Sequence, residues 1–212
     1  MKTIRSHHLI PLAASFALAA PSASAALIAV DSYVYGTNPE SQPQPTDFQG
    51  GVLSDVDNLK LTDGEFATGG WNDGTNVGFR NDDDNGEPQP RITFNLGAVF
   101  NVTTVDIWTV SDFLGLDESV SISSSTDDVT FSPTVTVDPI VWTAGFTNAK
   151  LRQGSIDVSA LPGGQFYQVD IFDKGQWMMI NEVQFFGTPI PEPSSVMLLG
   201  LVSLGLLRRR RN

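Results

Sequence analysis

The sequence predicts an all-β fold, an antiparallel β-sandwich, set between two apolar ends that carry targeting information. Apolar and polar residues alternate over many short runs, which is the period of a strand with one buried face. Turn-forming residues such as Gly97, Pro133, Pro139 and Gly175 separate these runs, as they do in sandwiches of short strands. No run between the two ends has the periodicity of a helix of useful length.

The first 25 residues are predicted to be a signal peptide. Lys2 and Arg5 give a positive start, residues 9–20 are apolar, and residues 23–25 form a small-residue cleavage site. We expect the mature chain to begin at Ala26 and to lie outside the cytoplasm.

The predicted strands follow from there. Residues 26–36, apolar and β-branched, predict a first strand, and residues 38–45, which contain three prolines, predict a loop. Six later runs each place apolar side chains on one face: Ile92, Phe94 and Leu96; Val105 and Ile107; Val120 and Ile122; Ile156 and Val158; Tyr167, Val169 and Ile171; Val183 and Phe185. The acidic stretch 76–90 predicts a loop.

The composition of the chain excludes several classes of ligand and of catalytic site. Removing residues 1–25 and 190–212 takes away six of the 12 basic residues but only one of the 24 acidic ones, which leaves 6 against 23 and a net charge of −17. Such a surface repels nucleic acid and anionic membranes, and it suits hard divalent cations, calcium first among them. The chain has no cysteine, and His7 and His8 both lie in the signal peptide. The mature chain therefore lacks thiolate and imidazole zinc sites, Ser-His and Cys-His pairs, and histidine bases.

The C-terminal end combines a short motif, an apolar stretch and a basic cluster. Pro191, Glu192 and Pro193 precede residues 194–207, which hold no charge, and Arg208, Arg209, Arg210 and Arg211 follow. As a helix, the apolar stretch would be about 21 Å long, which is short for a hydrocarbon core of about 30 Å and would need local thinning. An arginine cluster beside a membrane span stays cytoplasmic, so we expect a single spanning helix with the body of the protein outside.

This end resembles the PEP-CTERM sorting signal of exported bacterial proteins. The resemblance implies processing by an exosortase near the motif, transient anchoring in the inner membrane, and delivery to the cell surface or the extracellular matrix. It divides the chain into a signal peptide (1–25), a β-sandwich domain (26–189) and a sorting signal (190–212).

The middle of the chain resembles a discoidin-like, galactose-binding-like jelly roll. The resemblance rests on residues 58–65 (NLKLTDGE), Thr68 and Trp71, then on 91–97 (RITFNLG) and 102–107, and near the end on 166–171 and 181–185 (NEVQF). Members of this family are often carbohydrate-binding modules with a structural calcium ion. The resemblance therefore implies a jelly-roll sandwich, a possible sugar ligand and calcium, and it makes Asp63, Glu65, Thr68 and Glu182 the candidate calcium ligands.

A second acidic segment does not match a known calcium motif. Residues 81–86 (NDDDNG) fail the EF-hand pattern, because Asn81 occupies the first ligand place and Ile92 stands where the last glutamate belongs. This segment is interpreted as a solvated loop.

Sugar sites use flat aromatic rings together with a few placed polar groups. Trp177, beside residues 173–176, and Phe113, in the loop 111–116, are the candidate ligand-binding residues. Trp71 is expected in the core, and Trp108 on the sheet face opposite Ile107. The sequence departs from the best-known sugar-binding members in lacking a binding histidine.

These features favour a non-catalytic, exported protein that binds extracellular polysaccharide. One alternative is a purely structural or adhesive surface protein without a small ligand. Another is a carboxylate-based glycoside hydrolase, which would need two carboxyl groups about 5–9 Å apart in a cleft.

Overall fold

The computed structural model describes residues 24–37, 41–45, 48–80, 90–111, 119–145, 150–172 and 177–191. The described residues form ten β-strands and a short 3-10 turn, η2 (Phe48–Gly51). The strands are β1 (Ala26–Ile28), β2 (Ser32–Tyr35), β3 (Val77–Arg80), β4 (Arg91–Val110), β5 (Ser119–Ser125), β6 (Val135–Val137), β7 (Trp142–Ala144), β8 (Leu151–Asp157), β9 (Gly164–Phe172) and β10 (Trp177–Pro189).

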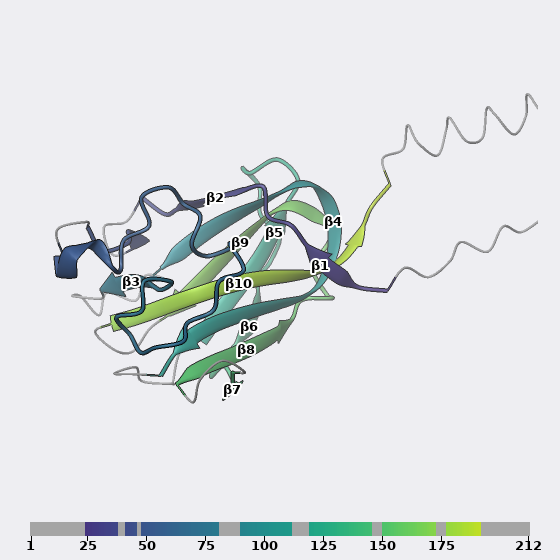
Figure 1. Ribbon diagram of the computed structural model, residues 1–212. Helices are drawn as coiled ribbons and strands as arrows, with labels where there is room; N and C mark the ends of the chain where they lie inside the picture. Colours follow the sequence, from purple (N-terminus) through teal and green to yellow (C-terminus); the bar gives the residue numbers. More distant parts are fainter. Residues whose placement is uncertain are drawn as a thin grey trace, which may run out of the picture.

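The strands make two antiparallel layers that share the long strand β4 (Figure 1). In the first layer, β2 and β9 flank the beginning of β4, and β5 and β6 continue beyond β9. In the second layer, β10 and β8 flank the rest of β4, β1 and β3 pair with β10, and β7 pairs with β8. The predicted all-β, antiparallel fold is confirmed.

Strand β4 passes from one layer to the other without interruption. Residues 91–95 pair with β9, whereas residues 100–109 pair with β10. Between these pairings Gly97 has a φ of 73°, a left-handed backbone that glycine adopts without steric cost. The prediction that Gly97 separates two strands is therefore wrong, because this glycine bends one strand.

The predicted first strand, residues 26–36, is in fact two strands. β1 joins the second layer through β10, and β2 joins the first layer through β4. The chain crosses between the layers over residues 29–31, and no local pattern in an apolar run marks such a crossing.

The main core lies between the layers and contains the faces expected from alternation. All the apolar residues of the six predicted runs are buried there. A second apolar cluster lies on the other face of the second layer, where residues 48–76 cover it. We call this the outer cluster; its buried members are Leu53, Ala67, Trp108, Val110, Leu151 and Met179.

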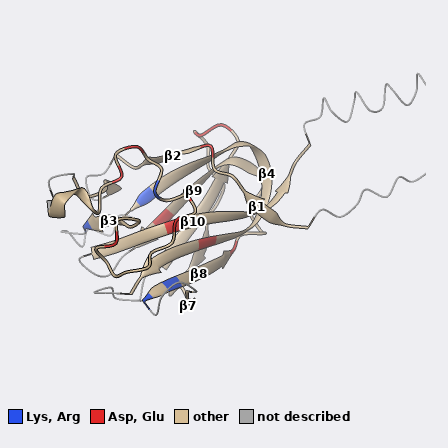
Figure 2. Cartoon of the chain, viewed as in Figure 1, with Lys and Arg blue, Asp and Glu red and all other residues tan. Residues whose placement is uncertain are grey.

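The two ends of β10 define the two ends of the molecule. The pairing register places the strand boundaries Arg80, Val110 and Leu151 beside Trp177, at what we call the Trp177 end. Pro189 lies at the opposite end, beside Phe100 and close to the start of β1, as Figure 1 shows. Acidic residues are spread over strands and loops, with few basic residues among them (Figure 2).

The predicted signal peptide (residues 1–25) and C-terminal helix (residues 194–207) lie outside the described residues, apart from Ser24 and Ala25. Within the described residues, no helix is both long and apolar enough to cross a membrane.

Candidate functional site

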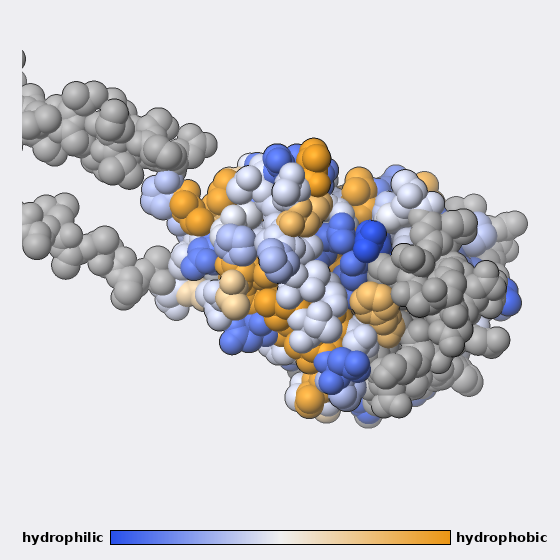
Figure 3. Space-filling view, turned by 180° about the vertical axis from the view of Figure 1, so that it is seen from behind, coloured by the Kyte–Doolittle hydropathy of each residue, from blue (hydrophilic) through white to orange (hydrophobic). Residues whose placement is uncertain are grey.

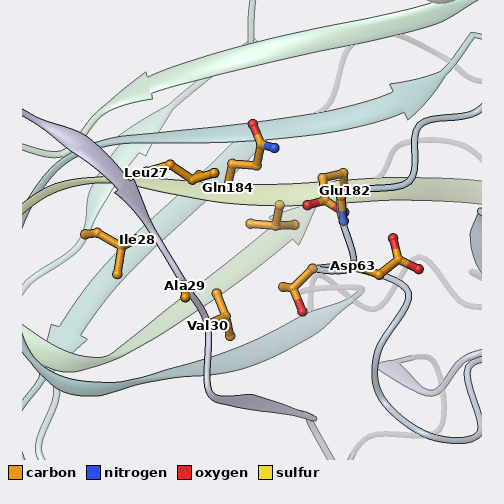
Figure 4. Close-up of a pocket in the computed structure, with 10 residues that line it drawn as sticks. Leu27, Ile28, Ala29, Val30, Asp63, Glu182 and Gln184 are labelled. Atoms are coloured by element: carbon orange, nitrogen blue, oxygen red, sulfur yellow. The ribbon is translucent and has the colours of Figure 1, made fainter.

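A pocket of about 340 Å³ lies between the chain around β1, the turn at Asp63 and Gly64, and β10. We call this turn the Asp-Gly turn. Residues 27–30 form one wall, residues 62–64 form the rim, and residues 182–184 of β10 form the floor (Figure 4). One wall is aliphatic and the floor carries a carboxylate. The pocket therefore combines an apolar surface with a placed acidic group.

Glu182 is the most unusual residue of this pocket, because its side chain is only 2% exposed. Burial raises the pKa of this carboxyl to about 8; the Gly64 amide, which donates to Oε2 at 3.3 Å, works against that rise, and the negative charge of Asp63 adds to it. The contact joins the last strand to the Asp-Gly turn. A cation beside Glu182 would stabilise the ionised form.

Asp63 shares the pocket with Glu182, but its carboxylate is exposed and faces away from Glu182 in Figure 4. Its Oδ1 accepts a hydrogen bond from the Glu65 amide at 2.8 Å and so shapes the turn. Glu65 and Thr68 are exposed and do not line the pocket. Of the four candidate calcium ligands, the structure brings two together.

Thr68 instead contacts Asp73, a residue that the sequence analysis did not single out. Oδ2 of Asp73 accepts from the Thr68 and Gly69 amides at 2.9 and 2.7 Å, and Oδ1 accepts from the Thr75 amide at 3.3 Å. Burial alone would raise the pKa of Asp73, but these hydrogen bonds outweigh it and lower the pKa. Asp73 is a loop-shaping residue, and only an Asp followed two residues later by Thr hints at this in the sequence.

Asn181 fixes the same loop onto β10. Its side chain, fully buried, accepts from the Ala67 amide at 3.1 Å and donates to Thr75 Oγ1 at 2.9 Å. This asparagine lies at an irregularity in the β10–β4 register, next to Glu182. The bulge thus places Asn181 against the loop and Glu182 in the pocket.

The donor set fits a calcium ion in part. Calcium takes six to eight oxygens, and carboxylates supply only some of them. Among the described residues, no group of three or more His, Cys, Asp or Glu side chains is close enough to hold a metal. Asp63 and Glu182 would therefore need main-chain oxygens of the turn as further ligands.

The second candidate site is at the Trp177 end. Trp177 begins β10 and pairs in register with Arg80 at the end of β3, whose guanidinium carbon lies 5.5 Å from the centre of a Trp177 ring. The ring is half-buried, because it packs on the outer cluster, and it is less exposed than the sequence suggested. Phe113 lies outside the described residues.

The other tryptophans lie in packed positions. Trp108 is buried on the face opposite Ile107, as predicted, with its ring centroid 4.9 Å from that of Phe66. Trp71 packs partly buried against the outer cluster, and Trp142, in β7, packs against the main core. Among the described tryptophans, Trp177 is the one that lies at a strand boundary at this end of the molecule, where β3 and β8 also have a terminus.

Comparison with protein families gives one match. A PEP-CTERM protein-sorting motif matches residues 189–211, which include the whole proline-glutamate-proline motif and the arginine cluster. No match was found among curated proteins.

Two solved structures resemble the fold. The C-terminal domain of a chitobiase from Bacteroides fragilis matches with a TM-score of 0.51 at 10% identity, over 78% of this chain and 100% of that domain. A fucose binding module from Streptococcus pneumoniae matches with a TM-score of 0.50 at 14% identity, over 77% of this chain and 96% of the module. Both resemblances inferred from the sequence are confirmed: the chain carries a PEP-CTERM protein-sorting motif, and its described residues share the fold of this chitobiase domain and this fucose binding module.

Proposed function

We propose that this protein is exported, processed by an exosortase, and placed at the cell surface or in the extracellular matrix, where its β-sandwich binds polysaccharide without catalysing a reaction. The observation that carries the proposal is the position of Trp177. Its ring lies at a strand boundary beside the exposed Arg80, in a fold shared with a fucose binding module. The sorting motif supports export.

The chemistry of Trp177 suits a sugar. The apolar face of a pyranose stacks on an aromatic ring, and a guanidinium donates hydrogen bonds to hydroxyl groups. Arg80 pairs with Trp177 across β3 and β10 and its guanidinium lies over the ring, so a sugar would stack on the part of the ring that Arg80 leaves uncovered. Phe113, which follows the last residue of β4 by three positions in the sequence, is the proposed second ring.

Calcium is proposed as a structural ion rather than a ligand of the sugar. Glu182 would hold it through its carboxylate, together with oxygens of the Asp-Gly turn, and the exposed Asp63 side chain would have to turn toward Glu182 to join it. The ion would offset the cost of burying the Glu182 charge and fix the turn to β10.

Substitution of Trp177 tests the binding site. Loss of the stacking surface in Trp177→Ala should weaken polysaccharide binding at least about tenfold, or ~1.4 kcal/mol, while Trp177→Phe keeps a ring and most of the affinity. The control is Trp142→Ala, at an edge strand of the same layer. Affinities come from titration calorimetry on variants whose melting curves show a folded domain. Equal affinities of the wild type and Trp177→Ala would rule out this site.

A further inference from the structure

Hydrogen bonds fix residues 61–67, which we call the strap, to three successive residues of β10. The Val183 amide donates to the Leu61 carbonyl at 2.7 Å, the Gly64 amide to the Glu182 carboxylate at 3.3 Å, and the Ala67 amide to the Asn181 side chain at 3.1 Å. The residues at the two ends of the strap are also fully buried. Packing and hydrogen bonds together therefore hold the strap on the strand.

The strap completes the outer cluster. Ala67 is one of the buried members of this cluster, and the Phe66 ring meets the Trp108 ring edge-on, with 4.9 Å between the ring centroids. Trp108 is only 4% exposed beneath this cover. If the strap left β10, this side of the outer cluster would open to water.

The same cluster supports the Trp177 ring. Trp177 and Met179 lie on one face of β10, because side chains two residues apart in a strand point the same way. Leu53 packs beside Met179: a Cβ on Gly78 would lie 2.9 Å from Cδ1 of Leu53 and 3.2 Å from Sδ of Met179, so these two side chains fill the space above the glycine. The orientation of the half-buried Trp177 ring therefore depends on the packing of the outer cluster.

We propose that the strap positions Trp177 for its ligand. Docking of the strap on residues 181–183 keeps the outer cluster packed, and the packed cluster holds the ring in the orientation that a sugar would meet. Phe66 is a positioning residue, because it acts through Trp108 and the cluster rather than on the ligand. The role of the ring in binding rests on the proposed function, whereas the packing between strap and ring is a property of the fold.

A ring that is already held in place binds with less loss of conformational freedom. Immobilising one side chain at an interface weakens binding by an amount that corresponds to roughly three- to tenfold in affinity. A loosened strap would leave the Trp177 ring free to change rotamer and would add this cost. The proposed calcium ion at Glu182 would act in the opposite direction, because it would fix the strap where the Gly64 amide already meets the strand.

The test replaces Phe66 and observes Trp177 directly. The full chain, labelled with fluorotryptophan and kept in detergent micelles, gives one fluorine NMR signal for each tryptophan, and Trp177→Phe identifies the signal of Trp177. In Phe66→Ala this signal should shift or broaden. The signal of Trp142 should not change, because that ring packs against the main core. A general loss of stability would not move one signal alone. Leu59→Ala, which shortens a 62% exposed side chain just before the strap, is the control and should match the wild type.

The affinity of the same variants measures the effect on binding. The probe is the polysaccharide that the wild type binds most tightly from a panel of bacterial and plant polysaccharides, titrated by calorimetry. Affinity should fall roughly three- to tenfold in Phe66→Ala and stay unchanged in Leu59→Ala. Phe66→Leu keeps an apolar side chain over Trp108, so it should lie between the wild type and Phe66→Ala in both measurements. It also covers the case in which Phe66→Ala does not fold.

Two results would overturn the positioning role: a wild-type Trp177 signal in the folded Phe66 variants, or affinities equal to that of the wild type. If the wild type binds no polysaccharide, the proposed function fails, and the fluorine signal alone decides whether the strap positions the ring.

Discussion

Glu182 shows how one buried side chain can depend on its surroundings. Val183 and Phe185 on the same strand face the main core, whereas the side chain of Glu182 faces the Asp-Gly turn, where a single backbone amide reaches it. Burial raises its pKa to about 8, so the folded state holds a proton that the unfolded chain would release near its usual value of 4.5. Protonation, or a cation beside it, would offset the cost of burying this carboxylate.

The first prediction concerns the pH dependence of stability. Because the pKa of Glu182 is raised in the folded state, its contribution to stability is complete below about 4.5 and is lost as the pH rises to about 8. In chelator, the melting temperature should therefore fall over this range. Glu182→Gln should flatten the fall, because the amide mimics the protonated acid.

At pH 8 in chelator, Glu182→Gln should melt at a higher temperature than the wild type, and calcium should reverse this order. Added calcium should raise the melting temperature of the wild type by several degrees and that of Glu182→Gln much less. Asp128→Asn serves as the control, because this exposed residue has a left-handed backbone that asparagine tolerates. An unchanged wild-type melting temperature on adding calcium would sink the calcium proposal, and equal pH slopes would sink the assignment to Glu182.

At the scale of elements, β2 is tied to the loop that follows it by a carboxylate. Asp55, only 7% exposed, accepts from the hydroxyls of Tyr33 and Tyr35, both at 2.5 Å, and from the amides of Leu59 and Lys60. Burial raises the pKa of both tyrosines, so they remain donors at any physiological pH. The cluster joins an edge strand of the first layer to the segment that covers the outer cluster.

Removing the Asp55 carboxylate should loosen the edge strand β2. Asp55→Ala leaves several buried donors without an acceptor and should lower the free energy of unfolding by about 3 kcal/mol. Asp57→Asn changes an exposed acid two residues away and should have almost no effect. Urea denaturation measures both. A loss below about 1 kcal/mol in Asp55→Ala would show that Asp55 does not hold β2 in place.

Elements differ in how far the sequence predicts them. Alternation identifies the buried faces of β5, β9 and β10, because side-chain direction follows from local strand geometry. It does not show that β4 continues through Gly97, or that residues 26–36 divide between two layers, because partners distant in sequence decide both. The roles of Asp55, Asp73 and Asn181 stay hidden for the same reason, since each depends on which loop amides meet it.

At the scale of the whole molecule, the two outer faces differ. Residues 48–76 cover the second layer through the outer cluster. From the other side, the space-filling view shows apolar patches between polar ones (Figure 3), and Val34 of β2 is 56% exposed. Glu182, a candidate calcium ligand, and Trp177, a candidate sugar-binding residue, both belong to β10, which links the Asp-Gly turn to the Trp177 end.

The central claim is that this domain binds extracellular polysaccharide. The most direct measurement is binding of the purified domain, residues 26–189, to an array of bacterial and plant polysaccharides, in calcium and in chelator. The account predicts binding to a defined glycan, stronger in calcium because the ion stiffens the turn on β10. If a domain shown to be folded binds none of the polysaccharides, the result would contradict polysaccharide binding and favour a structural surface protein.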